Sequence, residues 1–171
     1  ANLLSCDGTK ESLYYQQLSS PIRATMLNQG LYYLTKEKET TGYSHQFGWI
    51  HAFAHGGDLL TEVICHPRFP KSDIAEAFEI IGKIFKRVEI RFTNDEDWRL
   101  ARAFYEPILR GKIESSLLTA WLQTVEFPLK ETNDFHKFSN FRSCLLEIYL
   151  QLDCHNLLQD DLKKIIQSFY Y

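Results

Sequence analysis

Apolar residues recur at steps of three and four along most of the chain, the spacing that places them on one face of an α-helix. The clearest run follows Ser72, a candidate N-cap, and contains Ile74, Ala77, Phe78, Ile81, Ile84, Phe85 and Val88. No stretch alternates between apolar and polar residues as a half-buried strand does, and no two-residue hairpin turn is recognisable. The pattern therefore predicts an all-α protein.

Residues that favour helix ends divide the pattern into separate helices. Ser20 and Pro21 predict a helix that reaches about Lys38, because Ser caps helices and Pro favours their first turn. Residues 93–96 have the pattern of a capping box and begin a helix that closes near Gly111. Further helices are predicted over residues 11–18, 47–66, 113–127, 139–152 and 158–169. Residues 2–10 and 40–44 are expected to be irregular, and residues 131–138 are ambiguous.

Alternate helices start near residues 21, 71, 112 and 158, at intervals of about forty to fifty residues. Such intervals are typical of helical hairpins stacked as in HEAT or armadillo proteins, although the chain has no repeated sequence signature. No linker or shift in composition divides it. We therefore expect one all-helical domain over residues 1–171, built as an irregular HEAT- or armadillo-like α-α superhelix.

The segment 47–66, FGWIHAFAHGGDLLTEVICH, is predicted to be the helix around which the others pack. At about 100° per residue, one narrow line along it is polar and consists of His51, His55, Asp58 and Glu62. The opposite side is apolar and carries Phe53, Leu60 and Ile64. Apolar residues also flank the polar line. A helix that is apolar nearly all round is usually internal, so we expect a buried helix with a thin polar stripe.

Two glycines in the middle of this helix, Gly56 and Gly57, each cost about 0.8–1 kcal/mol relative to Ala. Their presence predicts either the close approach of a neighbouring helix or a local bulge. Both would bring a second element against the polar stripe. The side chains expected to approach are Glu96 and Arg99, from the helix that the capping box begins.

Buried polar groups must find partners, because an unpaired one costs roughly 1–3 kcal/mol. Three alternatives follow for the stripe: a hydrogen-bonded part of the core, a site for a divalent metal such as zinc, or a pocket for a non-metal ligand or substrate. A single ion could take His51 with His55, or His55 with Asp58. Candidates for further ligands are His45, Glu96 and Asp97. Ala52 stands where a zinc protease of the His-Glu-x-x-His type has its general base.

The net charge of −3 argues against nucleic acid as the main partner, because phosphate binding requires a clustered basic surface. The densest basic group is interleaved with Glu79 and Glu89 and consists of Lys83, Lys86, Arg87 and Arg91. We expect it to be a solvated face.

The cysteines, Cys6, Cys65, Cys144 and Cys154, form no Cys-x-x-Cys pair, and no secretory segment precedes them. We expect free, buried thiols in a cytoplasmic protein. No apolar run approaches the ~18 residues that a membrane span needs.

Three stretches resemble a bacterial family of proteins of unknown function. Residues 48–60, GWIHAFAHGGDLL, match the GWxHAxAHGxDLL signature of that family. Residues 95–101 look like its acidic segment followed by Arg-Leu-Ala. Asn140, Arg142 and Tyr149 are similar to its closing Asn, Arg and aromatic stretch. The resemblance runs from about residue 31 to residue 152.

The resemblance implies a helical, HEAT-like fold and a site around His51, His55, Asp58 and Arg99, but it brings no known reaction. Family members often have further helices ahead of this region, so the chain is expected to be a short member or the later part of one. The family tends to have an acidic residue and Arg before the Gly-Trp, where this chain has His-Gln-Phe at 45–47. Any role of that acidic residue therefore does not carry over.

Two functions follow. The first is a polar pocket for a ligand or substrate, with the candidate residues His51, His55, Asp58, Glu62, Glu96 and Arg99. The sequence does not decide between a binding protein and an enzyme, although hydrolysis by a His/Asp pair is the reaction easiest to build there. The alternative is a non-catalytic helical scaffold for a protein partner, in which the stripe is structural. A cleft that reaches the stripe favours the pocket, and a sealed stripe favours the scaffold.

Overall fold

The computed structural model describes residues 1–171, and its regular secondary structure is almost entirely helical, which confirms the predicted all-α class. The eight α-helices are α1 (Asn2–Gly8), α2 (Ser20–Lys36), α3 (Ala52–Cys65), α4 (Ile74–Arg87), α5 (Glu96–Leu109), α6 (Ser115–Leu122), α7 (Thr132–Cys154) and α8 (Asp160–Ser168). Two short strands, β1 (Tyr43–Ser44) and β2 (Gly48–Trp49), and a 3-10 helix, η1 (Lys71–Asp73), complete the regular structure. None of the helices combines the length and the apolar character that crossing a membrane requires.

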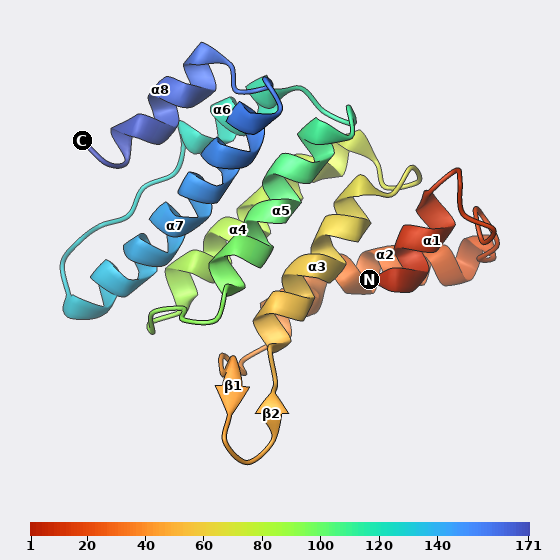
Figure 1. The fold of residues 1–171 in the computed structure, drawn as a ribbon, viewed down its shortest axis with the longest axis horizontal. Helices are drawn as coiled ribbons and strands as arrows, with labels where there is room; N and C mark the ends of the chain where they lie inside the picture. Colours follow the sequence, from red (N-terminus) through yellow and green to blue (C-terminus); the bar gives the residue numbers. More distant parts are fainter.

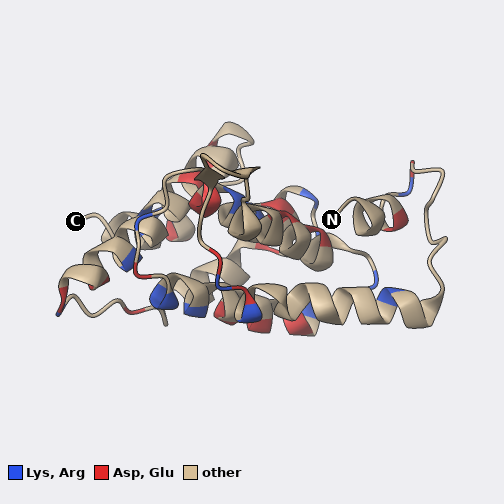
Figure 2. Cartoon of the chain, turned by 90° about the horizontal axis from the view of Figure 1, so that it is seen from below, with Lys and Arg blue, Asp and Glu red and all other residues tan.

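The helices form two layers (Figure 1). In the front layer α3, α5 and α7 lie side by side, and α2, α4 and α6 lie behind them. Figure 2 shows the layers from below, with the positions of acidic and basic residues along the ribbon interleaved over both. The helices of the two layers are therefore packed against each other, while the predicted HEAT-like stacking of hairpins stays a prediction.

The apolar positions that predicted the helices lie between the layers. All seven apolar residues of the run that follows Ser72 are buried, as are Phe53, Leu60 and Ile64 of α3. Aromatic rings join the layers around Phe104 of α5, whose centroid lies 4.9 Å from that of Phe78. The spacing of apolar residues therefore located the core correctly.

The first twenty residues differ from the prediction. Residues 2–8, expected to be irregular, form α1, whereas residues 11–18, expected to be helical, form turns and bends. The side chain of Leu4 is buried in the core, and Asp7 accepts hydrogen bonds from Leu18 and Arg23. These tertiary contacts stabilise α1, although its Asp-Gly pair favours a turn. Gln16 has a φ of 54°, which interrupts a helix at that position.

The central helix is shorter than predicted. It begins at Ala52 and not at residue 47, because Gly48–Trp49 pairs with Tyr43–Ser44 as an antiparallel hairpin. Gly48 and His51 have φ angles of 73° and 48°, in the left-handed region. Gly48 lies where the hairpin loop enters β2, and His51 is the N-cap that turns the chain into α3. Strands of two residues are too short to show an alternation, so the sequence pattern missed this hairpin.

The predicted capping box at residues 93–96 is wrong. The N-cap of α5 is Asp95, which has a φ of 64° and makes no side-chain cap. The carboxylate of Glu96 accepts a hydrogen bond of 2.9 Å from the backbone nitrogen of Asn94 instead of that of Thr93. The left-handed Asp95 lies directly before the helix, so α5 begins two residues later than a cap by Thr93 requires.

The ambiguous residues 131–138 are largely helical. α7 begins at Thr132 instead of near Ser139, because Glu131 and Asp134 form a capping box at its start. The earlier start makes α7 the longest helix of the chain.

All four cysteines are free, as predicted. Only Cys144 is buried, while Cys6 and Cys65 are half-buried and Cys154 is exposed. The expectation of buried thiols is therefore wrong for three of the four.

Candidate functional site

Glycines let the neighbouring helices approach α3 closely. A Cβ on Gly57 would lie 2.9 Å from the carbonyl oxygen of Arg99 in α5. A Cβ on Gly56 would collide with the side chain of Leu34 in α2. Close approach is therefore the correct explanation of these two residues, and it brings the arginine side of α5 against the polar face of α3.

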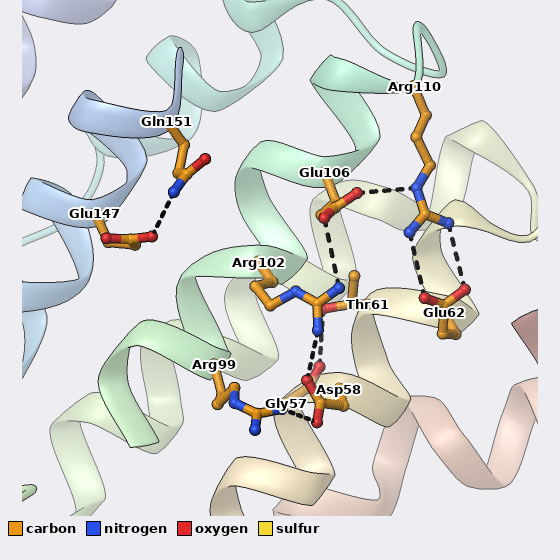
Figure 3. Close-up of polar contacts among 10 residues, drawn as sticks. All are labelled: Gly57, Asp58, Thr61, Glu62, Arg99, Arg102, Glu106, Arg110, Glu147 and Gln151. Atoms are coloured by element: carbon orange, nitrogen blue, oxygen red, sulfur yellow. Dashed lines mark hydrogen bonds and ion pairs between the residues drawn. The ribbon is translucent and has the colours of Figure 1, made fainter. Parts of the chain in front are cut away.

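Two arginines of α5 hold the carboxylate of Asp58. Arg99 donates to one of its oxygens and Arg102 donates to the other at 2.8 Å (Figure 3). Both carboxylate oxygens of Asp58 therefore have a hydrogen-bond donor on α5.

The pairing continues along the two helices. Glu106 lies 3.5 Å from Arg102 and accepts a hydrogen bond of 3.0 Å from Arg110 (Figure 3). Arg110 also donates to both oxygens of Glu62, at 3.2 and 3.3 Å. We call this chain of ion pairs the charge ladder, and its members are Asp58, Glu62, Arg99, Arg102, Glu106 and Arg110. Its order shows that α3 and α5 run in the same direction.

Burial and pairing act in opposite directions on the arginines of the ladder. Partial burial lowers the pKa of Arg102, but the carboxylates of Asp58 and Glu106 raise it by more, so this pKa lies above its ordinary value. Burial also lowers the pKa of Arg110, but the hydrogen bonds and charge of Glu62 contribute to a larger upward shift, so this pKa too lies above its ordinary value. Both side chains are therefore cationic throughout the neutral range.

The ladder lies at the surface, so the predicted buried stripe is wrong. The side chains of Asp58 and Glu62 are 18% and 12% exposed, and their arginine partners are between 31% and 41% exposed. Neither His51 nor His55 forms a hydrogen bond with Asp58, so the His/Asp pair suited to hydrolysis is not present. Of the stripe, only Glu62 borders one of the five main cavities, a space of about 230 Å³ that it shares with Cys65.

His51 lies outside the ladder, at the junction of the hairpin and α3. It is the N-cap residue of α3 and has left-handed backbone angles, φ 48° and ψ 34°. Its Nε2 atom is buried and has no hydrogen-bond partner. The ring centroids of His51 and Trp49 lie 4.5 Å apart, and those of His51 and His55 lie 6.1 Å apart. Non-glycine residues rarely adopt this conformation, and buried polar atoms are rarely unpaired.

Aromatic side chains of the hairpin extend from this histidine, through Trp49 to Tyr43. The ring of Tyr43 lies 5.1 Å from that of Trp49, in an edge-to-face arrangement. Both rings are about half exposed or more, and His55 is exposed beside them. We call this group the hairpin patch, and its members are Tyr43, Trp49, His51 and His55. It presents flat apolar faces together with the exposed side chain of His55, while Nε2 of His51 is buried beneath.

The sequence-predicted residues thus separate into three groups. Asp58, Glu62 and Arg99 belong to the ladder, while His51 and His55 belong to the hairpin patch. Glu96 joins neither group, because it is buried at the start of α5 and bonds to the chain beside it.

A metal at His51 and His55 has no third protein ligand in this fold. No group of three or more His, Cys, Asp or Glu side chains lies close enough together to hold an ion. The carboxylate of Asp58 is occupied by arginines. A metal bound here would therefore rest on two imidazoles and ligands from solvent, a weaker set than the three or four protein ligands of zinc sites.

A second polar cluster, missed in the sequence, joins α1, α2 and the end of α3. Asp7, Arg23 and His66 are all buried. Asp7 accepts hydrogen bonds from Arg23 and His66, and from the backbone of Leu18 at 2.8 Å. The hydrogen bond from Arg23 lowers the pKa of Asp7 to about 2, although burial opposes it. Burial lowers the pKa of His66, although Asp7 opposes that shift.

The two groups that sequence reasoning missed differ in their signals. Arg102, Glu106 and Arg110 follow Arg99 at steps of three and four, so their common face on α5 could have been found beside the acidic residues of α3. The cluster around Asp7 comes from three separate segments. No spacing in the sequence connects these segments, so only the fold reveals it.

Comparison with known proteins gives a family but no function. No characterised protein and no solved structure matches the chain. A profile of a family described as a protein of unknown function, DUF2785, matches residues 1–150. This match begins well ahead of the stretches that suggested the resemblance and covers most of the chain. The chain therefore belongs to the DUF2785 family of proteins of unknown function.

Proposed function

We propose that this chain is a ligand-binding helical protein whose site is the hairpin patch, with Arg99 and Asp58 of the ladder beside it. The observation that carries the proposal is the state of His51, whose Nε2 atom is buried without a hydrogen-bond partner while its backbone is left-handed. Residues held in such conformations cost of order 1–3 kcal/mol each and cluster at binding and active sites.

Both features of His51 oppose folding, and a ligand can compensate for both. Nε2 is buried beside the ring of Trp49, so the ligand must displace that ring to reach it. The hydrogen bond that the ligand then forms satisfies an atom that otherwise loses roughly 1–3 kcal/mol of hydrogen bonding. The exposed ring of Trp49 offers a face for stacking, and such contacts contribute roughly 0.5–1.5 kcal/mol beyond the burial of area. The proposed ligand is therefore a small molecule with a flat face and a hydrogen-bonding edge.

The proposal is one of binding and does not include a reaction. A general base would need an orienting partner, and Asp58, the carboxylate nearest in sequence to both histidines, bonds to Arg99 and Arg102. We also propose a cytoplasmic location, because four unpaired thiols suit a reducing compartment.

A screen of small metabolites and divalent cations by thermal shift tests the site. Compounds that raise the melting temperature of the wild type are measured again on His51→Ala and His55→Ala, with His155→Ala, at the exposed C-cap of α7, as the control. We expect the shift to disappear in the first two variants and to persist in the third. Elemental analysis of untagged protein, with the His51→Ala/His55→Ala double variant beside it, checks zinc separately.

A scaffold for a protein partner is the second candidate, and the ladder favours it. Asp58 and Glu62 have arginine partners within the chain, so they require no ligand. This candidate predicts that Asp58→Ala lowers the free energy of unfolding by about 1 kcal/mol, since the stranded arginines are partly exposed. It also predicts that thermal shifts caused by small molecules are the same in His51→Ala as in the wild type.

A further inference from the structure

A groove on the rear layer lies apart from the hairpin patch and from the ladder. It runs between one face of α2 and the segment that leads from α3 into α4, and it encloses about 510 Å³. Its floor is apolar and is formed by the buried side chains of Leu27, Leu31 and Phe69. Pockets of about 300–1,000 Å³ with an apolar floor are the usual size for small ligands.

The groove has charges of opposite sign at its two ends. Arg23 and Arg68 line it near the start of α2, where Arg68 donates to Gln16. Asp73 and Glu76 line it further along, where Glu76 accepts a hydrogen bond of 2.6 Å from Tyr32. The basic end therefore lies near the beginning of α2, and the acidic end lies at its second half.

Three of the four charged side chains at the ends are free of ion pairs. Arg68, Asp73 and Glu76 take part in no salt bridge, unlike Arg23, which is paired with Asp7. The hydrogen bond to Glu76 and, to a smaller extent, the charge of Asp73 raise the pKa of Tyr32. Both carboxylates belong to residues that line the same end of the groove.

The distance between the ends sets the length of a matching ligand. Arg23 and Tyr32 lie about 13 Å apart along α2, at 1.5 Å per residue. An extended peptide rises about 3.3 Å per residue, so about four residues span the groove. Asn28 lies between the ends, lines the groove and has no side-chain hydrogen bond within the chain, so its amide can pair with a peptide backbone.

We propose that this groove binds a short extended peptide of about four residues, with a basic side chain at one end, an acidic side chain at the other and an apolar residue between them. The basic side chain meets Asp73 and Glu76, and the acidic side chain meets Arg68. The apolar residue lies on Leu27 and Leu31.

Four acetylated and amidated peptides test the proposal on the full chain: Lys-Leu-Ala-Glu, Glu-Leu-Ala-Lys, Lys-Leu-Ala-Lys and Glu-Leu-Ala-Glu. Amide chemical-shift mapping by NMR gives both the affinity and the location of each peptide. We expect one of the two mixed-charge peptides to bind best and to shift the amides of Leu27, Leu31 and Phe69. Two orders of the mixed sequence are needed because the groove fixes the positions of the charges and not the direction of the chain.

A reversal of charge supplies the decisive comparison. Arg68→Glu is expected to weaken the better mixed-charge peptide about threefold to fivefold, the effect of losing an exposed ion pair. It is also expected to make Lys-Leu-Ala-Lys the preferred peptide. Lys83→Glu makes the same change of charge at an exposed position of α4 outside the groove and should leave the preference unchanged.

Three results would overturn the proposal. The first is that no peptide shifts the groove amides at millimolar concentration. The second is that all four peptides bind equally well. The third is that Arg68→Glu and Lys83→Glu have the same effect, which would mean that any binding reflects net charge alone.

Discussion

The ring of His66 donates a hydrogen bond from Nε2 to the carboxylate of Asp7 across 3.2 Å, although 59 positions separate the two residues. The direction of this bond follows from the other ring nitrogen, since Nδ1 accepts a hydrogen bond of 3.1 Å from the backbone of Arg68. The neutral ring with its proton on Nε2 is therefore the form that satisfies both partners. This contact fastens α1 to the end of α3, and its energy depends on pH.

Acid should destabilise the protein in two steps. Burial lowers the pKa of His66 in the folded state, so below its unfolded value of about 6.5 the unfolded chain binds more protons and stability falls as the pH falls. Hydrogen bonding to Arg23 lowers the pKa of Asp7 to about 2, and this contribution of roughly 2 kcal/mol is complete above about pH 4 and is lost between about pH 4 and pH 2.

Urea unfolding at a series of pH values measures these steps. His66→Gln should remove the fall that begins near pH 6.5 and retain the fall at lower pH. His155→Gln, at an exposed position, should reproduce the wild-type profile. A flat profile for the wild type between about pH 7 and pH 5 would contradict the assignment to His66.

Asp7→Asn should be among the more damaging single substitutions. It leaves the buried guanidinium of Arg23 without a counter-charge, and breaking a buried ion pair on one side costs about 3–5 kcal/mol. Chemical denaturation gives the loss directly. Asp153→Asn, an exposed acidic residue that forms no ion pair, is the matched control and should change stability by less than about 0.5 kcal/mol.

Gly57→Ala should lower the stability, although Ala favours a helix by about 1 kcal/mol over Gly. The added methyl group would meet the backbone of Arg99 at 2.9 Å, and a backbone segment packed in a helix cannot move aside as a side chain can. Overpacking of this kind costs about 1–3 kcal/mol. A rise in the melting temperature would mean that the two helices separate easily and would contradict the close packing.

Alkylation should discriminate between the cysteines. Cys154 is exposed, Cys144 is buried, and burial raises the pKa of Cys65 to about 12. Because the thiolate is the reactive form, iodoacetamide at about pH 8 should modify Cys154 before Cys65 and Cys144. Peptide mapping by mass spectrometry reads out the order. Early modification of Cys65 in folded protein would show that its thiol is activated and not suppressed.

The fold was largely predictable because buried apolar residues recur along a helix at steps of three and four. The apolar residues of α4 and of the apolar side of α3 gave the core directly. The site was less predictable, because the ends of elements depend on single backbone conformations. His51 and Asp95 adopt left-handed angles that no residue type signals strongly, and these two residues displaced the predicted helix start and the predicted cap.

Side-chain partners were the least predictable part. Helical geometry placed His51, His55, Asp58 and Glu62 on one line, but it did not show which neighbours they would meet. Asp58 bonds to the arginines of α5, so the stripe divides between two groups with different environments. Such choices depend on the distance between two helices, which Gly57 sets and which a single-helix projection omits.

The contact at Gly57 also has a consequence for the motions of the chain. With their backbones in contact and the ladder closing their outer edge, α3 and α5 should open to solvent together, as one cooperative unit, and their amide protons should exchange with deuterium more slowly than those elsewhere. The two-residue strands of the hairpin have few backbone pairs and should exchange quickly. The molecule would then combine a rigid frame with a mobile edge, and the edge is the part that carries Trp49 and His51.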